Sequence, residues 1–375
     1  MKFDLALALA TTALTTSVCF ASAAMAASAL CVAPADVSGD GCHRSIQSAI
    51  DAAVAGTVIN VYPGRYHEVA AARTVVVLGG SHQFGLFIDK SDVAIQGVDA
   101  NGRRIADWSK VQAFITTNAT NAFGPSAIFV QGDHVTLSGL GIGVNTGGLN
   151  KTIEVIGDNF ALEHSDITDL QGSIYINDFR FDVSQNTSHL RSYRIEGNNF
   201  RDGVSVDVAS GAGVSGPASG RLIAGNTFVN SKAFPSISFN GAGTGIKWFT
   251  HPVGGATIDG NIFINTFASD DTTELMRAGH IQARGVYERS QLDWSGILAS
   301  NIFNQAYATG PRPPEMLREF AYSMHDASAC AGSGVCTFSA GRIGASLDGE
   351  IAIALAGDAT IGRVGSMATR LYDTY

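Results

Sequence analysis

The sequence has little charge, and no long apolar run follows its first residues. Charged residues make up only 15% of the 375 residues, and the net charge is −9. That balance excludes the basic stripe that a nucleic-acid partner requires. The sequence also lacks a glycine-rich phosphate loop after a strand, an HExxH zinc motif and a CxxC pair. Apolar residues nevertheless reach 45%, which is ample material for a core.

The first 26 residues are typical of a secretory signal peptide. A lysine stands near the start, an apolar stretch follows, and Ala24-Met25-Ala26 forms a small-x-small cleavage site. Asp4 departs from a purely positive start. An N-terminal membrane anchor is the alternative, but the run is rich in Thr and Ser and short for a span. We therefore expect a secreted, periplasmic or cell-surface protein with no membrane span after signal removal.

Export places the cysteines in an oxidising compartment. Cys19 falls inside the signal peptide, so the mature chain keeps Cys31, Cys42, Cys330 and Cys336. Their short loops favour the disulfides Cys31–Cys42 and Cys330–Cys336, although sequence alone leaves the pairing open. The four residues show no metal-ligand spacing.

A six-residue unit of the form I-x-G-N-x-F recurs along the middle of the chain. Clear copies start at Ile195, Ile223, Ile258 and Leu298, and looser copies start at Ile95, Leu137 and Leu162. Successive starts lie about thirty residues apart, a period typical of stacked supersecondary units. Each unit opens with apolar–polar alternation, which indicates a short strand, and the intervals carry no helical pattern. The repeat predicts short parallel strands in stacked coils.

Four asparagines occupy the same place in consecutive units: Asn198, Asn226, Asn261 and Asn301. Stacked at one corner, their amides could hydrogen-bond along the pile, as in the Asn ladders of cross-β stacks. The preceding glycine suits a turn with positive φ. Gly-Asn is also common turn chemistry, which would explain one copy but not Asn and Phe in register four times. We therefore predict an inward-facing asparagine ladder.

The segment before the repeats predicts a helix near residues 45–54. Ile46, Ile50 and Val54 recur at helical spacing, Ser45 is placed to cap, and Gly56 ends the pattern. The following TVINVYPGRY is typical of a first strand and turn. Because a solenoid exposes an apolar end, the helix is a natural capping element.

These segments, SIQSAIDAAVAGTVINVYPGRYHE and the repeated IxGNxF, resemble right-handed parallel β-helix proteins of the pectin-lyase-like superfamily. The resemblance covers roughly residues 40–310. It implies an all-β fold, a right-handed parallel β-helix solenoid with an N-terminal capping helix, within a domain over 27–310. Proteins of this kind include pectate and alginate lyases, polygalacturonases, phage tailspikes and surface proteins without known catalysis. The resemblance is specific for fold rather than for activity.

The C-terminal part, 311–375, contains a second feature. Residues 336–364 echo the capping segment, since aligning Gly56 with Gly357 places Ile50 on Ile351. The echo predicts a connector followed by the truncated start of a second β-helix. The alternative is that this segment plugs the far end of the first solenoid.

Charged side chains concentrate in one window, 270–289. Lyases of this fold need a base that takes the proton α to a uronate carboxyl, and a group that neutralises the carboxylate. On that basis we expect Asp270, Asp271 and Glu274 to bind Ca²⁺, Lys247 or Arg284 to act as base, and Arg277 to bind substrate, with His280 as a further catalytic candidate. The alternative is a solvated loop whose charges face water.

Two functions remain open from the sequence. One is an exported polysaccharide lyase that acts on an acidic glycan, with Ca²⁺ as a candidate cofactor. The other is a non-catalytic cell-surface or adhesive β-helix, which could be a fragment of a longer tandem-repeat chain. The expected partner in both is a polysaccharide or a cell-surface glycan, and no nucleic acid is expected.

Overall fold

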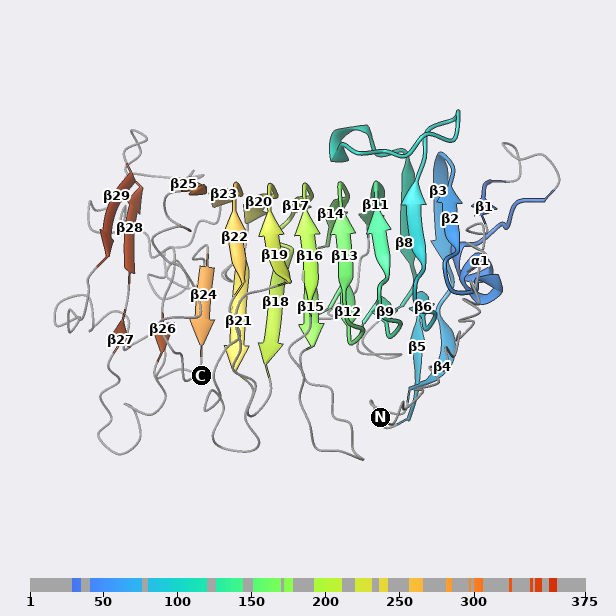
Figure 1. The fold of residues 1–375 in the computed structure, drawn as a ribbon, viewed down its shortest axis with the longest axis horizontal. Helices are drawn as coiled ribbons and strands as arrows, with labels where there is room; N and C mark the ends of the chain where they lie inside the picture. Colours follow the sequence, from blue (N-terminus) through green and yellow to red (C-terminus); the bar gives the residue numbers. More distant parts are fainter. Residues whose placement is uncertain are drawn as a thin grey trace, which may run out of the picture.

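The computed structural model shows a right-handed parallel β-helix, in which the chain winds through three long sheets (Figure 1). The structure describes residues 29–34, 41–75, 80–119, 126–143, 151–169, 172–177, 192–210, 220–230, 236–241, 256–265, 281–284, 297, 300–305, 324–325, 338–339, 341–345 and 351–355. The signal peptide predicted for 1–26 lies outside these residues. Within the described part, no helix is long and apolar enough to cross a membrane.

The three sheets are named here in the order in which each coil visits them. The first sheet contains β1 (Ala29–Val32), β2 (Val58–Val61), β7 (Ala94–Gly97), β10 (Thr136–Ser138), β13 (Phe160–Glu163), β16 (Tyr193–Glu196), β19 (Arg221–Ala224) and β22 (Thr257–Asp259). The second contains β3 (Gly64–Glu68), β8 (Ala113–Thr117), β11 (Leu140–Gly143), β14 (Asp166–Thr168), β17 (Asn199–Arg201), β20 (Thr227–Asn230), β23 (Ile262–Asn265) and β25 (Ile302–Gln305). The third contains β6 (Leu86–Ile88), β9 (Ile128–Val130), β12 (Ile153–Val155), β15 (Ser173–Asn177), β18 (Ser205–Ser210), β21 (Ile237–Gly241), β24 (Ile281–Arg284), β26 (Met324–His325) and β27 (Phe338–Ser339).

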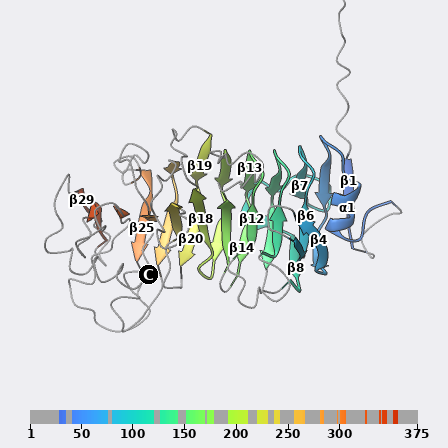
Figure 2. The same cartoon turned by 90° about the horizontal axis from the view of Figure 1, so that it is seen from below.

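Each coil contributes one strand to each sheet, as in the run β13, β14, β15, and the next coil pairs with it in parallel. Figure 2 shows the coils stacked along one axis, from the N-terminal helix to the C-terminal strands. The parallel β-helix implied by the repeat is therefore confirmed.

Period-two alternation builds the core. In the first sheet, one apolar residue from each coil points inward and is at most 2% exposed: Ile59, Ile95, Leu137, Leu162, Ile195, Ile223 and Ile258. In the second sheet the inward rings of Phe200, Phe228 and Phe263 stack, with centroids 4.8 and 5.1 Å apart. The residues between these inward positions form the outer faces of the solenoid.

The asparagine ladder is present and faces inward. Nδ2 of Asn198, Asn226 and Asn261 each donates to Oδ1 of the next asparagine, at 3.0, 3.0 and 2.8 Å. These three side chains are fully buried, and the row of hydrogen-bonded asparagines ends at Asn301. Gly225, which precedes Asn226, has φ 61°, a conformation that favours glycine. The ladder prediction is confirmed.

The helix α1 (Ile46–Ala52) closes the N-terminal end. Ser45 accepts a hydrogen bond from the Ser48 N–H at 3.1 Å, and Ile46 and Ile50 are fully buried in the core. The helix is shorter than predicted: Ala53 is already extended, so Val54 leaves the buried face and is 57% exposed. Its placement on the apolar stripe was therefore wrong.

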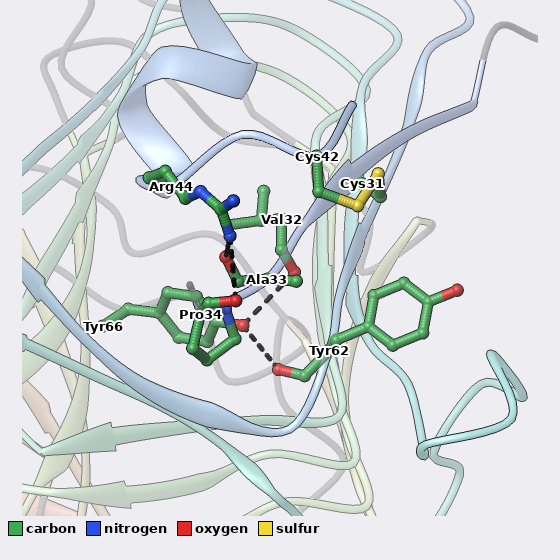
Figure 3. Close-up of a disulfide and its surroundings, with 8 residues drawn as sticks. All are labelled: Cys31, Val32, Ala33, Pro34, Cys42, Arg44, Tyr62 and Tyr66. Carbon is green, nitrogen blue, oxygen red and sulfur yellow. Dashed lines mark hydrogen bonds between the residues drawn. A yellow bond between two sulfur atoms is a disulfide. The ribbon is translucent and has the colours of Figure 1, made fainter. Parts of the chain in front are cut away.

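A strand that was not predicted precedes the helix. β1 pairs with β2, so TVINV forms the second strand of its sheet rather than the first. The disulfide Cys31–Cys42 joins β1 to the segment before α1, as expected (Figure 3). Beside it, Arg44 donates to the carbonyls of Ala33 and Pro34 at 3.3 and 2.9 Å. Cys330 and Cys336 lie outside the described residues.

Two hairpin-like pairs lie outside the three-sheet pattern. β4 (Ala71–Val75) and β5 (Gly80–Phe84) pair antiparallel, and Phe84 from this pair stacks on Phe129 of the third sheet with centroids 4.9 Å apart. Near the C-terminus, β28 (Gly341–Ala345) pairs antiparallel with β29 (Ile351–Leu355). Ile351 therefore lies on a strand, whereas its alignment with Ile50 would place it on a helix. The division at 311 and the second β-helix beyond it stay predictions.

Candidate functional site

Of the residues predicted to form the site, Arg284 alone lies within the part of the chain that the structure describes. Arg284 ends β24 of the third sheet and pairs in register with Asn240 of β21 and His325 of β26. Lys247, Asp270, Asp271, Glu274, Arg277 and His280 lie outside the described residues, so their roles stay predictions. Within the described part, no group of three or more His, Cys, Asp or Glu side chains could hold a metal ion.

The outer face of the third sheet carries three polar residues that the sequence analysis did not single out. Glu154, Tyr175 and Asp207 stand in register on three successive coils, next to Phe129 of the preceding coil. Glu154 is fully buried, and its Oε1 accepts a hydrogen bond from Lys151 Nζ at 2.7 Å. The same ammonium lies 4.1 Å from the centre of the Tyr175 ring. Lys151 is therefore committed to a structural pair, which leaves it a poor candidate for substrate recognition.

The outer face of the first sheet is hollowed into an open groove of about 680 Å³. Its lining comes from strands β10, β13, β16, β19 and β22 and from the turns that lead into them. Figure 1 shows these strands side by side on the face turned toward the reader. One outward row of the groove lining carries side chains of different size, with Ala161 and Thr257 at its ends and the larger Arg194 and Leu222 between them.

Among the residues that the structure describes, the groove lining includes arginine side chains and no carboxylate. Arg194 of β16 has a side chain that is 53% exposed. Arg221 of β19, one coil further, is nearly buried, with its guanidinium 5.7 Å from the centre of the Tyr193 ring. Ordinary alternation explains the position of Arg194, because its neighbour Ile195 faces the core. Arginine can bind carboxylates through two parallel hydrogen bonds, so this lining suits an anion.

A hydrogen-bonded row fixes the histidine at one end of the groove. Asn159 Nδ2 lies 3.1 Å from His134 Nε2, and His134 Nδ1 lies 3.2 Å from Asp92 Oδ1. Since Nδ2 can only donate, Nε2 is the acceptor in this arrangement and the ring proton faces Asp92. Asp92, His134 and Asn159 all have positive φ, between 52° and 58°, at the same corner of successive coils. The imidazole is thereby held as part of the groove wall.

The lining residues limit the chemistry of the groove. Glycosidases of the usual kind need two carboxyl groups that flank the scissile bond, and no Asp or Glu is among the described lining residues. What the arrangement offers is recognition: the exposed guanidinium of Arg194 for an acidic group, and hydroxyls and amides such as Ser192 and Asn159 for neutral polar groups.

Sequence reasoning missed this groove for a definable reason. Its cations lie on different coils and are separated by about thirty residues in the chain, so no window of the sequence is rich in charge. The register of the repeat was the available signal. Aligning the copies on Ile195 and Ile223 places Arg194 and Leu222 at one outward position.

Comparison with known proteins gives structural matches alone. No protein-family model and no curated protein matches the sequence. The chain is similar in structure to pectin methylesterase from Aspergillus niger, with 12% identity, 79% of this chain and 90% of that chain covered, and a TM-score of 0.38. It is also similar to pectin methylesterase PemA from Erwinia chrysanthemi, with 13% identity, 78% and 92% covered, and a TM-score of 0.33. At such low identities and TM-scores, neither match assigns a residue or an activity to this chain.

Proposed function

We propose that this is an exported, carbohydrate-directed β-helix protein that binds an acidic polysaccharide in the groove of the first sheet. The observation that carries the proposal is the exposed Arg194 in a groove whose described lining residues include no carboxylate. The rest of the molecule does not favour anions in general, because its net charge is −9. A local cationic groove on an acidic protein selects a ligand whose negative groups fit that place.

The shape of the groove favours a polymer. Its lining residues come from five successive coils, so with strands about 4.8 Å apart the groove crosses roughly 19 Å of the solenoid. It is open to solvent along this length rather than enclosed, and an open trough suits an internal segment of a chain better than a compact small molecule. The hydroxyl of Ser192 and the amide of Asn159, which also line the groove, suit sugar hydroxyls.

Cleavage by β-elimination is the finer part of the proposal. Lys247 or Arg284 would take the proton, Arg277 would bind the uronate carboxylate, and His280 is a further candidate. Asp270, Asp271 and Glu274 would hold Ca²⁺, which neutralises the same carboxylate. Chain connectivity supports this placement: the segment 242–255, which includes Lys247, connects β21 to β22, and Thr257 of β22 lines the groove.

Export is supported by two independent features. The N-terminal segment has the pattern of a signal peptide, and Cys31 and Cys42 are bonded in the structure. Structural disulfides persist in oxidising compartments. A secreted or cell-surface protein would meet an extracellular polysaccharide directly.

The test uses the mature full-length chain and a panel of polygalacturonate, alginate, a glycosaminoglycan and a neutral glucan. Binding is measured by calorimetry, and unsaturated products are followed by ultraviolet absorbance, with calcium and with a chelator. Binding to an acidic polymer with calcium-dependent product formation is the expected result. Binding without product would favour the non-catalytic surface protein. No preference for any acidic polymer over the glucan would overturn the proposal.

A further inference from the structure

Glu163 joins two arginines from opposite directions at the edge of the groove. It ends β13, and its side chain is only 7% exposed. Oε2 accepts a hydrogen bond from Arg104 Nη2, and Oε1 accepts one from Arg194 Nη2. Arg104 lies in the connection between β7 and β8, whereas Arg194 lies on the coil after Glu163. One carboxylate thus holds two guanidinium groups that come from separate parts of the chain.

The two arginines have different surroundings. Arg194 lines the groove and Arg104 does not. Arg104 Nε also donates to Ser138 Oγ at 3.3 Å, so this side chain is anchored at a second point. Within the described part of the chain, Arg194 Nη1 makes no hydrogen bond, and its side chain is 53% exposed. Glu163 therefore fixes one edge of the Arg194 fork and leaves the other edge available to a ligand.

We propose that Glu163 is a positioning residue, which orients Arg194 so that the groove prefers free carboxylates over their esters and over neutral sugars. The inference rests on the proposed function of the groove. A free arginine side chain has several rotatable bonds, and ordering it on ligand binding costs affinity. A planar fork already held by a buried carboxylate avoids much of this cost and presents its donors in one direction. A carboxylate can accept two such hydrogen bonds in parallel, whereas an ester carries no charge.

If Glu163 acted only through its charge, its neutralisation would change the affinity for an acidic glycan in the opposite direction from a loss of positioning. Glu163 is an anion close to the anion-binding arginine, so its neutralisation should tighten the binding of an acidic glycan if charge alone matters. If Glu163 orients Arg194, the same change should weaken binding. The sign of the change therefore separates the two explanations.

Charge-matched variants make this comparison sharp. We call the hydrogen bonds from Arg104 and Arg194 to Glu163 the Glu163 clamp. The double variant Arg104→Ala with Glu163→Gln removes one positive and one negative charge, so it keeps the net charge of the wild-type protein but lacks the clamp. Glu196→Gln is the control, because it removes a negative charge near Arg194 without removing a hydrogen bond to it. Glu196 Oε2 lies 3.7 Å from Arg194 Nε, which is beyond hydrogen-bond distance, and the Glu196 side chain is exposed. Thermal melting verifies that each variant is folded.

The experiment measures the affinity of each full-length variant for an acidic oligosaccharide and for its methyl ester. We expect the double variant to bind the acid about fivefold to tenfold more weakly and to lose preference over the ester, and Glu196→Gln to bind as tightly as wild type or tighter. Wild-type affinity and selectivity in the double variant, or tighter binding in Glu163→Gln, would overturn the positioning role.

The variant Arg194→Ala separates two hypotheses: that Glu163 positions Arg194, and that the groove binds the glycan at all. Loss of binding in Arg194→Ala with normal binding in the double variant would leave the groove in place and refute the role of Glu163. Normal binding in Arg194→Ala would refute the groove itself, and with it the proposed function.

Discussion

The side chain of Asn226 makes four hydrogen bonds in the interior of the solenoid. Its Oδ1 accepts from the N–H and from Nδ2 of Asn198 at 2.9 and 3.0 Å, and its Nδ2 donates to Ile195 O and to Asn261 Oδ1 at 2.9 and 3.0 Å. The side chain thus satisfies backbone groups of neighbouring coils where no water competes. A buried polar group that loses its only hydrogen-bond partner destabilises the folded state by more than an average hydrogen bond stabilises it.

We predict that Asn226→Ala lowers the free energy of unfolding by about 1–3 kcal/mol, because the buried Asn198 N–H and the Ile195 carbonyl each lose the hydrogen bond that the Asn226 side chain makes to them. Denaturant unfolding followed by circular dichroism measures the change. The matched control is Thr227→Ala, the adjacent residue on the outward side, for which a change within about 0.5 kcal/mol is expected. Equal stability of Asn226→Ala and the parent would contradict the structural role of the ladder.

The asparagine ladder can be predicted from the sequence, whereas the Glu163 clamp cannot. The ladder repeats one letter at one position, so the alignment of copies predicts it. Its N-terminal end is less visible, because Ser165 takes the place of asparagine there and its N–H donates to Asn198 Oδ1 at 2.9 Å. The clamp joins residues 59 and 31 positions apart and includes Arg104 from a connection that is not repeated. No local pattern encodes such a contact.

Glu68 ties the second sheet to the start of the helix. Its Oε1 accepts from the Ile46 N–H at 2.6 Å. Burial raises the pKa of Glu68 above its ordinary value of 4.5, although hydrogen bonds from Ile46 and Gln47 and the nearby His67 act in the opposite direction. Because the folded protein binds this proton more tightly than the unfolded chain, ionisation of Glu68 opposes folding.

This contribution should change with pH. The stability of the wild-type protein relative to Glu68→Gln is expected to be greatest in acid, below the ordinary glutamate pKa, and to fall as the pH rises through the raised pKa. Unfolding free energies measured for both proteins over about pH 4 to pH 8 test this. A difference that is constant, or that grows with pH, would show that burial does not dominate the environment of Glu68.

At the scale of elements, the N-terminal cap combines α1 with β1 and a disulfide. The sequence predicted the helix because Ser45, Ile46 and Ile50 carry local signals for a start and a buried face. The end of the helix at Ala52 could not be predicted in this way, because Val54 continues the apolar spacing. Only the extended backbone at Ala53 turns Val54 away from the core. Likewise β1 is recognised by its pairing with β2, which is a tertiary contact.

The cap disulfide should stabilise the folded state. Cys31 and Cys42 close a loop with a sequence separation of 11, for which chain entropy gives roughly 2–3 kcal/mol. We expect the Cys31→Ser/Cys42→Ser double variant to lose about this amount in denaturant unfolding, and reductant to destabilise the parent similarly. The internal control is the variant itself, which should respond less to reductant than the parent because it keeps only the predicted Cys330–Cys336 disulfide. An unchanged unfolding midpoint in the variant would show that the cap does not depend on this bond.

At the scale of the whole molecule, the repeat determines the architecture and the outward positions determine the surface. Seven inward positions of the first sheet carry only Ile or Leu, and this uniformity made the solenoid predictable. The outward positions vary from coil to coil, since Ala161, Arg194, Leu222 and Thr257 share one row. A functional surface assembled from such variable positions becomes visible only when the coils are stacked in register.

The central claim is that the first-sheet groove binds an acidic glycan, and a pair of arginine variants tests it most directly. Arg194 lies in the groove, whereas Arg201 lies on the second sheet with a similar exposure of 48%, where it is paired with Asp166 at 2.7 Å. Calorimetric titration of wild type, Arg194→Ala and Arg201→Ala with one acidic oligosaccharide compares two exposed arginines that differ in location. The account predicts that Arg194→Ala weakens binding at least about tenfold and that Arg201→Ala stays within about twofold of wild type. Equal affinity of all three proteins, or equal losses in both variants, would contradict it.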